Sequence, residues 1–460
     1  MELPAAFVRR VVRDLGPEEG AALCAALDGV PPVSVRLHPV KCGDAGALSE
    51  RLRATGAVPW CPDGRYLAER PSFTFDPAFH AGAYYVQEAS SQFVGCLAGD
   101  VAGRRVLDLC AAPGGKTTLY ASLAGPDGLV VANEIDRRRA SVLADNVRKW
   151  GAGNVVVTAC EPQALGDFEA WFDVVAVDAP CSGEGMFRKD AASRGEWSEN
   201  NVRMCAARQE GILAEAWRAL RPSGRLIYST CTFNRDEDEG ALERLLERVG
   251  AEAVEADVPE AGDGWGIVCG RVGAFRTYRF YPHRACGEGF FAAVACKAPD
   301  SGGRVRTPKA RRTLFAPVDK AATAELERWV AGPAKMRFAR VADTLYGWFA
   351  AQAEAVRTLS EAVPVIYSGV AMGQLFKGRL RPDAALAFFA GLDRTALPVA
   401  ELEHDEALDY LRKQEFAVAA LAEGMNLVCC EGRALGFAKR IGARVNNLYP
   451  NSLRILKSER

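Results

Sequence analysis

The chain has 460 residues, of which 49% are hydrophobic and 25% charged, a composition typical of a globular protein with more than one hydrophobic core. No stretch reaches the roughly 18 unbroken apolar residues of a membrane span. Arginines interrupt the apolar pattern of the first residues, unlike a signal peptide. The formal net charge of −1 argues against indiscriminate nucleic-acid binding but allows a local basic face. We expect a cytoplasmic protein of several domains without membrane contact.

Cysteine is frequent, but its spacing is not that of a metal site. The sequence holds 14 cysteines and 4 histidines, without a CxxC pair or a Cys/His ladder of zinc spacing. Most of these thiols are expected to be reduced and packed as small apolar side chains. We therefore expect no metal ion.

The first predicted unit is a small leader domain over residues 1–86. It is expected to contain a helix near residues 4–28, followed by short strands and turns rich in proline and glycine. Tyr84 and Tyr85 lie at its end. Like Tyr449, they are expected to pack in the core rather than to stack on bases.

From about residue 104 short apolar runs alternate with helical segments. The runs have the length of strands: RVLDL, LVVAN, NVVVT, FDVVAVD and GRLIYST. The helical segments between them are TTLYASLA, DRRRASVLADNVRKW and VRMCAARQEGILAEAWRAL. This alternation predicts an α/β fold with a mostly parallel sheet and helices on both faces. FFAAVACK at 290–297 is predicted to add a late antiparallel strand.

The C-terminal part begins with a break at DSGGRVRTPKARR, which is rich in glycine, proline and arginine and predicts a linker. A mixed segment follows to about residue 395. Over 396–460 a helix (ALDYLRKQ) and strands (MNLVCCE, RALGFAKRI) predict a small, mostly β module. Basic residues crowd 304–312 and 433–460, which fits a solvated face as well as a surface for RNA.

The motif VLDLCAAPGGKTT places a buried strand, a turn of small residues and a helix start near Lys116 in succession. Ligands of open α/β sheets bind beyond the carboxyl ends of the strands. Gly114 and Gly115 let the backbone approach a ligand closely, and the helix N-terminus favours anionic groups. At the end of the second strand, Glu134 can accept hydrogen bonds from both hydroxyls of a ribose.

Two common nucleotide motifs do not fit this loop. A P-loop needs glycine where Cys110 stands, which disfavours an NTPase, and the loop does not match the dinucleotide fingerprint GxGxxG. A glycine turn with an acid on the second strand suits any adenosine-type cofactor. From these residues alone, a methyltransferase, a dehydrogenase and other enzymes stay open.

Two further strands end in residues whose side chains can take part in catalysis. FDVVAVDAPCSGEGMFRKD ends a buried strand with Asp178 and Cys181, and GRLIYSTCTF ends another with Cys231. All three are predicted to lie at the same edge of the sheet as the cofactor loop. A thiolate that adds to C6 of a pyrimidine turns C5 into a nucleophile, and an acid at N3 and N4 helps to stabilise the developing charge. The pattern does not decide which cysteine attacks.

CAAPGGK, DAPCSGEG and STCT, in this order and spacing, resemble the motifs of the Sun-domain RNA cytosine-5 methyltransferases. DAPCSGEGMFRKD and the C-terminal half are particularly similar to the RsmF-type enzymes, which modify small-subunit ribosomal RNA. The resemblance is dense from YYVQEASS at 84 to residue 297. It extends more loosely through YSGVAMGQLFKGRLRPD to NNLYPNSLR.

The resemblance implies four parts. They are an N-terminal RNA-binding domain over 1–86, a Rossmann-like class I methyltransferase core over 87–298, a linker and connecting domain over 299–395, and a PUA-like RNA-binding domain over 396–460. The core would bind S-adenosyl-L-methionine. RNA binding by the tail is expected to follow shape and phosphates more than base sequence.

Site residues are also implied by the resemblance. Cys231 matches the family's nucleophile, and Cys181 matches the cysteine linked to product release. Asp178 lies where the family has an acid near the cofactor and the target base. Glu134 would bind the ribose, and Glu161 stands where many members carry an aspartate that contacts the adenine. The cofactor loop would comprise Cys110, Ala111, Ala112, Pro113, Gly114, Gly115 and Lys116.

The implied activity is methyl transfer from S-adenosyl-L-methionine to C5 of cytosine in 16S ribosomal RNA, through a covalent adduct of a cysteine with C6, by a monomer. The cytosine must be unstacked to be reached. One alternative is the same chemistry on tRNA. Another is a non-catalytic RNA-binding ribosome-assembly factor, against which the intact Asp178, Cys181 and Cys231 speak. Arg188 is expected to meet an RNA phosphate or to form a surface ion pair.

Overall fold

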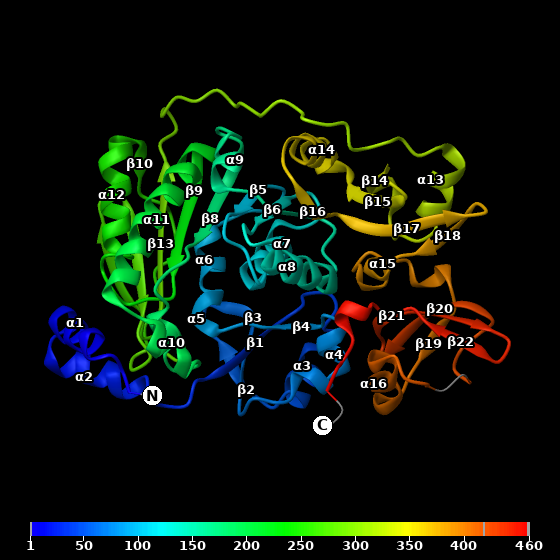
Figure 1. Cartoon of the computed structure of the whole chain (residues 1–460), viewed down its shortest axis with the longest axis horizontal. Helices are drawn as coiled ribbons and strands as arrows, with labels where there is room; N and C mark the ends of the chain where they lie inside the picture. Colours follow the sequence, from blue (N-terminus) through cyan, green and yellow to red (C-terminus); the bar gives the residue numbers. More distant parts are fainter. Residues whose placement is uncertain (1, 417–418, 458–460) are drawn as a thin grey trace.

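The computed structural model describes residues 2–416 and 419–457, and these residues contain four β-sheets. Figure 1 shows a large central sheet, with the N-terminal sheet below it and the C-terminal half beside it. In the described ranges, no helix is both long and apolar enough to cross a lipid bilayer.

The N-terminal part is a helical pair followed by an antiparallel sheet. The helix predicted near residues 4–28 is two helices, α1 (Ala5–Leu15) and α2 (Pro17–Ala26). Gly16 has a φ of 83°, and Pro17 has no amide hydrogen with which to continue α1. The sheet order is β2-β3-β1-β4, with α3 (Ala45–Arg51) between β1 and β2 in the chain. Its strands are β1 (Val33–Leu37), β2 (Ala54–Val58), β3 (Cys61–Leu67) and β4 (Tyr84–Val86).

The central sheet has ten strands in the order β11-β12-β13-β9-β8-β5-β6-β7-β16, with β10 beside β13. Its parallel strands are the five apolar runs recognised in the sequence: β5 (Arg105–Asp108), β6 (Leu129–Asn133), β7 (Val155–Thr158), β8 (Phe172–Asp178) and β9 (Leu220–Thr230). The predicted late strand is β13 (Phe290–Lys297), antiparallel to β9. The remaining strands are β10 (Ala253–Val254), β11 (Val268–Val272), β12 (Phe275–Phe280) and β16 (Val365–Ser368).

The strand order reverses at β5. The chain runs outward through β6 and β7, and then returns to the other side of β5 for β8 and β9. A crevice opens beyond the carboxyl ends of the strands at such a switch point, because the helices that follow β5 and β8 lie on opposite faces. The topology therefore places the ends of β5 and β8 around one potential ligand site.

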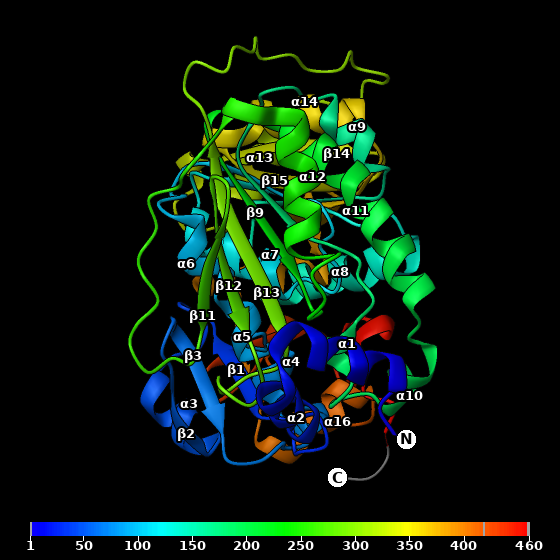
Figure 2. The same ribbon diagram turned by 90° about the vertical axis from the view of Figure 1, so that its left-hand side faces the viewer.

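Helices cover both faces of this sheet, as predicted. α6 (Val94–Ala98), α7 (Gly115–Ala124) and α8 (Arg137–Trp150) pack on one face, and α11 (Glu199–Ala219), α12 (Glu239–Val249) and α14 (Ala353–Ala362) pack on the other. Figure 2 shows α6 and α12 on opposite sides of β9 and β13. Within one strand, Val130 and Val131 face opposite cores, as the alternation of side chains requires.

The C-terminal half contributes to the central sheet and also forms two sheets of its own. β16 pairs with β7, so part of the segment 299–395 extends the central sheet. The third sheet contains β14 (Met336–Val341), β15 (Thr344–Phe349), β17 (Val370–Phe376) and β18 (Arg379–Pro382), and α13 (Lys320–Glu327) precedes it. The fourth contains β19 (Val399–Glu401), β20 (Gly424–Cys430), β21 (Arg433–Ile441) and β22 (Arg444–Asn447), with α16 (His404–Arg412) beside it.

The N-terminal sheet is fastened to the start of α7 by a buried arginine. Arg36 on β1 is 1% exposed. Its guanidinium donates to the Gly115 carbonyl oxygen (3.2 Å), to Thr118 Oγ1 (2.6 Å) and to Gln87 Oε1 (2.9 Å). The loop between β5 and α7 is thus held from outside the central sheet as well as from within it.

Candidate active site

A cavity of about 800 Å³ lies at the carboxyl ends of β5, β6 and β8. Seven of the predicted site residues line it: Cys110, Ala112, Glu134, Glu161, Asp178, Cys181 and Cys231. A smaller cavity of about 170 Å³ lies on the other side of the β5–α7 loop. It is lined by Ala111, Pro113, Gly115 and Lys116, and shares Cys110, Ala112 and Asp178 with the first. Of the predicted residues, only Gly114 lines neither cavity.

Gly114 shapes the loop through its backbone. Its φ of 112° lies in the region that side chains rarely adopt, and a Cβ there would lie 3.0 Å from Leu143 Cδ1. α7 begins at the next residue. Side chains outside the loop hold its carbonyl groups: Asn146 Nδ2 donates to the Pro113 oxygen (2.8 Å), and Arg139 donates to the Ala112 oxygen (3.1 Å).

Glu134 at the end of β6 brings a carboxylate into the large cavity. The residue is 4% exposed, and its carboxylate accepts the Asp136 amide (3.1 Å) and pairs with Arg139 (3.2 Å). The neighbouring Asn133 amide donates to the carbonyl oxygens of Leu109 (3.3 Å) and Cys160 (2.9 Å), which ties the ends of β5, β6 and β7 together. Glu161, by contrast, is exposed, and its side chain does not cap α9 (Pro162–Gly166).

Asp178 forms a charged bridge between two strand ends and the loop. Lys116 Nζ lies 2.8 Å from one carboxylate oxygen, and Ser229 Oγ donates to the other at 2.8 Å. Burial opposes the charge of Lys116, but the ion pair and hydrogen bond with Asp178 outweigh it and raise the lysine pKa. The bridge keeps an acid at the cavity wall beside the thiols.

The two thiols face each other across the ends of β8 and β9. Cys181 Sγ and Cys231 Sγ are 3.3 Å apart, at hydrogen-bond distance for a thiol pair. The hydrogen bond with Cys231 and the burial of the side chain raise the pKa of Cys181 well above its ordinary value. Cys181 therefore keeps its proton at neutral pH. Residues 50 positions apart in the sequence thus form one pair of contacting thiols.

A buried polar cluster behind the thiols joins the two cysteine loops. Glu237, which is 0% exposed, accepts hydrogen bonds from the Ser182 amide (2.9 Å), Asn234 Nδ2 (2.7 Å) and Gln209 Nε2 (3.0 Å). Asn234 also donates to Glu184 Oε1 (3.1 Å). These residues were not among the predicted site residues. Ser182, Glu184, Asn234 and Glu237 closely follow the two cysteine motifs, but their local pattern does not distinguish them from residues of a solvated loop, and Gln209 lies on α11.

Asp108 is a further polar residue beside the cavities that was not among the predicted site residues. It ends β5 at 1% exposure and accepts a hydrogen bond from Thr117 Oγ1 (2.6 Å). Burial raises the pKa of Asp108 to about 7, with Thr117 opposing the shift. The aspartate of VLDL thus lies under the loop and lines the smaller cavity.

Arg188 lies neither at the surface nor open to RNA. Its side chain is 7% exposed and pairs with Glu288, which is 4% exposed, at 3.0 Å. Its guanidinium also donates to the Gly287 carbonyl oxygen (2.6 Å). The expectation of an RNA phosphate contact or a surface ion pair is wrong, because the loop at 281–289 folds over this arginine. Tyr84 and Tyr449 are each 1% exposed, as expected of core residues.

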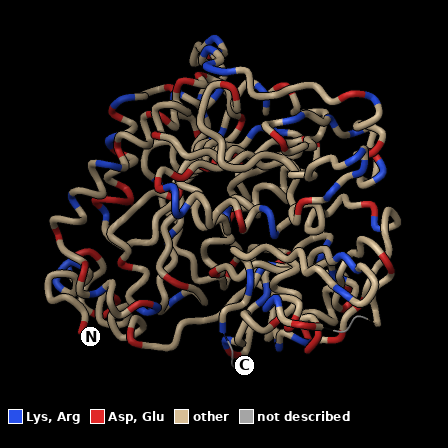
Figure 3. Tube along the Cα trace, turned by 45° about the vertical axis from the view of Figure 1, so that its right-hand side comes forward, with Lys and Arg blue, Asp and Glu red and all other residues tan. Residues whose placement is uncertain are grey.

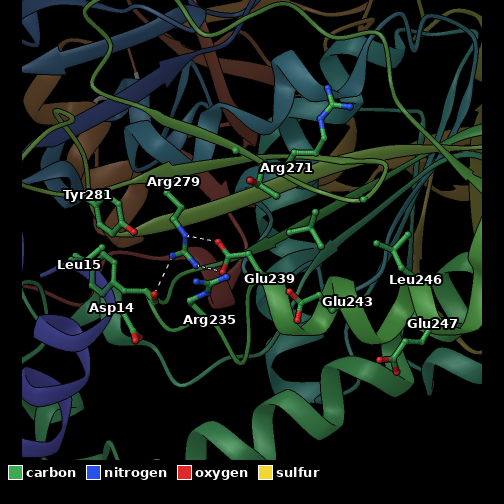
Figure 4. Close-up of a pocket in the computed structure, with 15 residues that line it drawn as sticks. Asp14, Leu15, Arg235, Glu239, Glu243, Leu246, Glu247, Arg271, Arg279 and Tyr281 are labelled. Atoms are coloured by element: carbon green, nitrogen blue, oxygen red, sulfur yellow. Dashed lines mark hydrogen bonds and ion pairs between the residues drawn. The ribbon is translucent and has the colours of Figure 1, made fainter.

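A third cavity, of about 920 Å³, lies between α12 and the β11–β12 hairpin (Figure 4). Arg279 reaches into it from β12, pairs with Asp238 (3.0 Å) and also contacts Glu239. Glutamates of α12 line the same wall, so the charges of the cavity compensate one another. The cavity contains none of the predicted site residues. Across residues 2–416 and 419–457, no group of three or more His, Cys, Asp or Glu side chains could hold a metal ion.

Three family models match the chain in succession. Residues 3–89 match the N-terminal domain of 16S rRNA methyltransferase RsmF, residues 98–295 match 16S rRNA methyltransferase RsmB/F, and residues 398–455 match the methyltransferase RsmF PUA domain. Two curated relatives are named ribosomal RNA small subunit methyltransferase F. The one from Erwinia tasmaniensis is 32% identical over 420 residues, and the one from Klebsiella pneumoniae is 33% identical over 416 residues. Each alignment covers 86% of this chain and 84% of the relative.

Solved structures share the fold of the central part. A methyltransferase homolog protein from Pyrococcus horikoshii has a TM-score of 0.53 at 27% identity, and covers 64% of this chain and 94% of its own. NSun6 from Pyrococcus horikoshii, solved with SFG, has a TM-score of 0.54 at 20% identity, and covers 65% of this chain and 99% of its own. The central sheet and its helices are therefore a methyltransferase fold of the Rossmann-like class.

Proposed function

This chain belongs to the ribosomal RNA small subunit methyltransferase F family, and from that premise we propose that it transfers a methyl group from S-adenosyl-L-methionine to C5 of a cytosine in 16S ribosomal RNA. One observation carries the cytosine-C5 chemistry. The thiols of Cys181 and Cys231 lie 3.3 Å apart on the wall of the same cavity that the glycine loop and Glu134 enclose.

The residues around the cavity fit S-adenosyl-L-methionine. The volume of about 800 Å³ lies within the range of small-molecule sites. Glu134 presents a buried carboxylate suited to two ribose hydroxyls, and the loop from Cys110 to Lys116 presents backbone groups to the rest of the cofactor. Glu161, on the same wall, is proposed to face the adenine. When bound, the cofactor supplies an electrophilic methyl group.

Cys231 is proposed to act as the nucleophile. Its sulfur would form a bond to C6 of the cytosine, which raises the electron density at C5. The STCT motif supports this assignment, because Cys231 stands where the family has its nucleophile, and Cys181 lies in contact with it. Asp178, held by Lys116 and Ser229, would hydrogen-bond the polar edge of the base as charge develops.

The reaction ends with loss of the C5 proton and departure of Cys231 from C6, which restores the aromatic ring and the free thiol. Cys181 is the side chain in contact with the leaving sulfur. We propose that it assists this release step. The leader domain over 1–86 and the module over 396–460 would bind RNA on either side of the core.

The test is formation of a covalent complex with RNA that contains 5-fluorocytidine, in the presence of cofactor. Fluorine at C5 blocks the proton loss, so the cysteine adduct should accumulate and survive denaturing electrophoresis. Cys231→Ser should abolish the adduct. Cys181→Ala should instead retain ordinary RNA as a stalled covalent complex. Cys205→Ser, a buried thiol on α11 outside the cavity, is the matched control and should behave as wild type.

An adduct that survives Cys231→Ser and disappears in Cys181→Ser would reverse the two roles. Bisulfite mapping of cellular RNA, with and without the gene, identifies the substrate. Loss of a methylated cytosine from 16S ribosomal RNA is the expected result. Loss from tRNA alone would assign the same chemistry to the other RNA, and no change in either would contradict the proposal.

A further inference from the structure

A cleft of about 820 Å³ lies between the β17–β18 hairpin and strands β20, β21 and β22 of the fourth sheet. We call it the hairpin groove. Its lining includes Arg328, Phe376, Lys377, Arg379, Arg381 and Lys439. Figure 1 shows β18 and β22 at the end of the molecule away from β8 and β9, so the groove is separate from the cavity with the two thiols.

Positive charge dominates the hairpin groove. Of its five cations, Arg328 pairs with Glu325 at 3.2 Å. Lys377, Arg379, Arg381 and Lys439 form no ion pair with any residue in the described ranges. Figure 3 turns this end of the molecule forward and shows lysines and arginines along it.

The two acids of the groove do not cancel these cations. Glu325 accepts the backbone amide of Leu380 (2.9 Å), and Glu423 accepts the backbone amide of Gly442 (3.1 Å). Both carboxylates keep their charge, but the five cations of the lining outnumber them. The four cations without an ion-pair partner remain available to an anionic partner, and one of them, Lys377, lies with its Nζ 5.6 Å from the centroid of the Phe376 ring.

Phe376 adds an aromatic surface to this charge. Phe376 is the last residue of β17 and is 68% exposed. It is paired with Arg379 across the hairpin. The turn between them is Lys377 (φ 50°) and Gly378 (φ 76°), the left-handed pair of a tight two-residue hairpin. This turn leaves the Phe376 ring exposed beside Lys377 and Arg379. An exposed ring interleaved with unpaired cations suits a chain of phosphates and bases.

We propose that the hairpin groove binds a single-stranded segment of the RNA substrate, with a base stacked on Phe376 and phosphates held by Lys377, Arg379, Arg381 and Lys439. The proposal rests on the proposed function for the identity of the polymer as RNA. It adds that the β17–β18 hairpin of the connecting domain binds RNA together with the fourth sheet. Because the groove is distant from the thiols, the substrate must be an extended RNA rather than an isolated nucleotide (Figure 1).

Stacking is tested by fluorescence anisotropy of a short labelled single-stranded RNA with the full-length protein, without cofactor. Loss of base stacking on an aromatic ring should weaken binding by about five- to tenfold in Phe376→Leu. Phe376→Tyr should restore wild-type affinity, because tyrosine stacks equally well. A duplex RNA of the same sequence should be bound with the same affinity by all three proteins.

The phosphate contacts are tested through salt dependence. Each phosphate contact with single-stranded RNA contributes about −0.7 to the slope of log affinity against log salt, so Lys377→Gln/Arg379→Gln should reduce the slope by about 1.4. Lys320→Gln/Lys335→Gln removes the same charge from exposed positions of the same domain outside the groove, and should leave the slope unchanged.

These binding measurements are independent of methyl transfer. A failure of the fluorocytidine test would remove the proposed chemistry and leave the groove result standing. Equal affinity of wild type and Phe376→Leu, or equal slope changes in the groove variant and its control, would overturn the groove. A dimer in analytical ultracentrifugation that Phe376→Leu dissociates, with RNA affinity unchanged, would overturn it too by showing a second copy as the occupant.

Discussion

The cavity with the two thiols and the hairpin groove differ in whether their polar side chains have partners within the protein. Around the thiols, the polar groups are held by protein partners: Asp178 has Lys116 and Ser229, and Glu237 has three donors. In the groove, four cations have no ion-pair partner among the described residues, and a phenylalanine ring faces solvent. The first arrangement suits chemistry, which needs a geometry set before the substrate arrives. The second suits a flexible polyanion, which can adapt to scattered charges.

The difference predicts two kinds of loss. Changes at Asp178, Glu134 or Glu237 should reduce turnover, cofactor affinity or stability, because each of these side chains has several partners. Changes in the groove should reduce only RNA affinity and its salt dependence. The following variants test this contrast, from the largest expected effect to the smallest.

Asp178→Asn should reduce kcat by about 10²–10³-fold, because it removes the carboxylate that would orient the polar edge of the base and breaks the ion pair with Lys116. Methyl transfer from labelled cofactor to RNA measures this. Asp173→Asn, on the same strand but away from the cavity, is the control and should retain wild-type kcat. An Asp178 variant with near-normal kcat would show that the preset charge is not needed for chemistry.

Glu237→Ala should lower the free energy of unfolding by about 3 kcal/mol, because it leaves buried donors from Ser182, Asn234 and Gln209 without an acceptor. Urea unfolding measures the change. Glu243→Ala, an exposed position on α12, should change stability little. If the two variants were equally stable, the buried cluster would not be what holds the cysteine loops together.

Glu134→Gln should raise the Kd of S-adenosyl-L-methionine about tenfold, because a neutral amide forms weaker hydrogen bonds with ribose hydroxyls than a carboxylate does. Calorimetric titration measures the Kd. Glu161→Gln should have a smaller effect, since that side chain is exposed. RNA affinity should stay unchanged in both variants. A parallel loss of RNA affinity would show that the cavity also contributes to RNA binding, contrary to the contrast between cavity and groove.

Asp108 predicts a pH dependence of stability. Its pKa is about 7 in the folded protein and near the ordinary value of 3.8 in the unfolded chain. Between about pH 4 and 7 the folded state therefore keeps a proton that the unfolded chain releases, so stability falls as pH rises through this window. Asp108→Asn should flatten that part of the curve of melting temperature against pH. Asp127→Asn, at an exposed loop, should leave the curve unchanged.

Much of the fold followed from local patterns. The five parallel strands and β13 lie where the apolar runs predicted them, because a buried strand must be apolar along its whole length. The break between α1 and α2 at Gly16 and Pro17 was also a local signal, although the single helix expected near 4–28 missed it. The rim of the cavity followed from a topological rule, because parallel strands all end at the same edge.

Contacts between distant segments could not be predicted in this way. The buried pair of Arg188 and Glu288 joins residues 100 positions apart, and its burial depends on how a loop folds over the core. Glu237 looked like one of several acids in a polar run, yet it is fully buried among groups from two other segments. The hairpin groove needs Arg328, Phe376 and Lys439 to converge from three elements.

The sequence by itself determined the α/β core, the glycine loop at the end of β5, and the candidate catalytic side chains of Asp178, Cys181 and Cys231. These depend on periodicity and on motif order, which are properties of the chain. Tertiary structure alone decided that Cys181 and Cys231 form one pair, that this contact and burial raise the pKa of Cys181, and that four cations near Phe376 have no ion-pair partner among the described residues. The physical reason is that pKa, burial and pairing depend on distances of a few ångströms between side chains that are far apart along the chain.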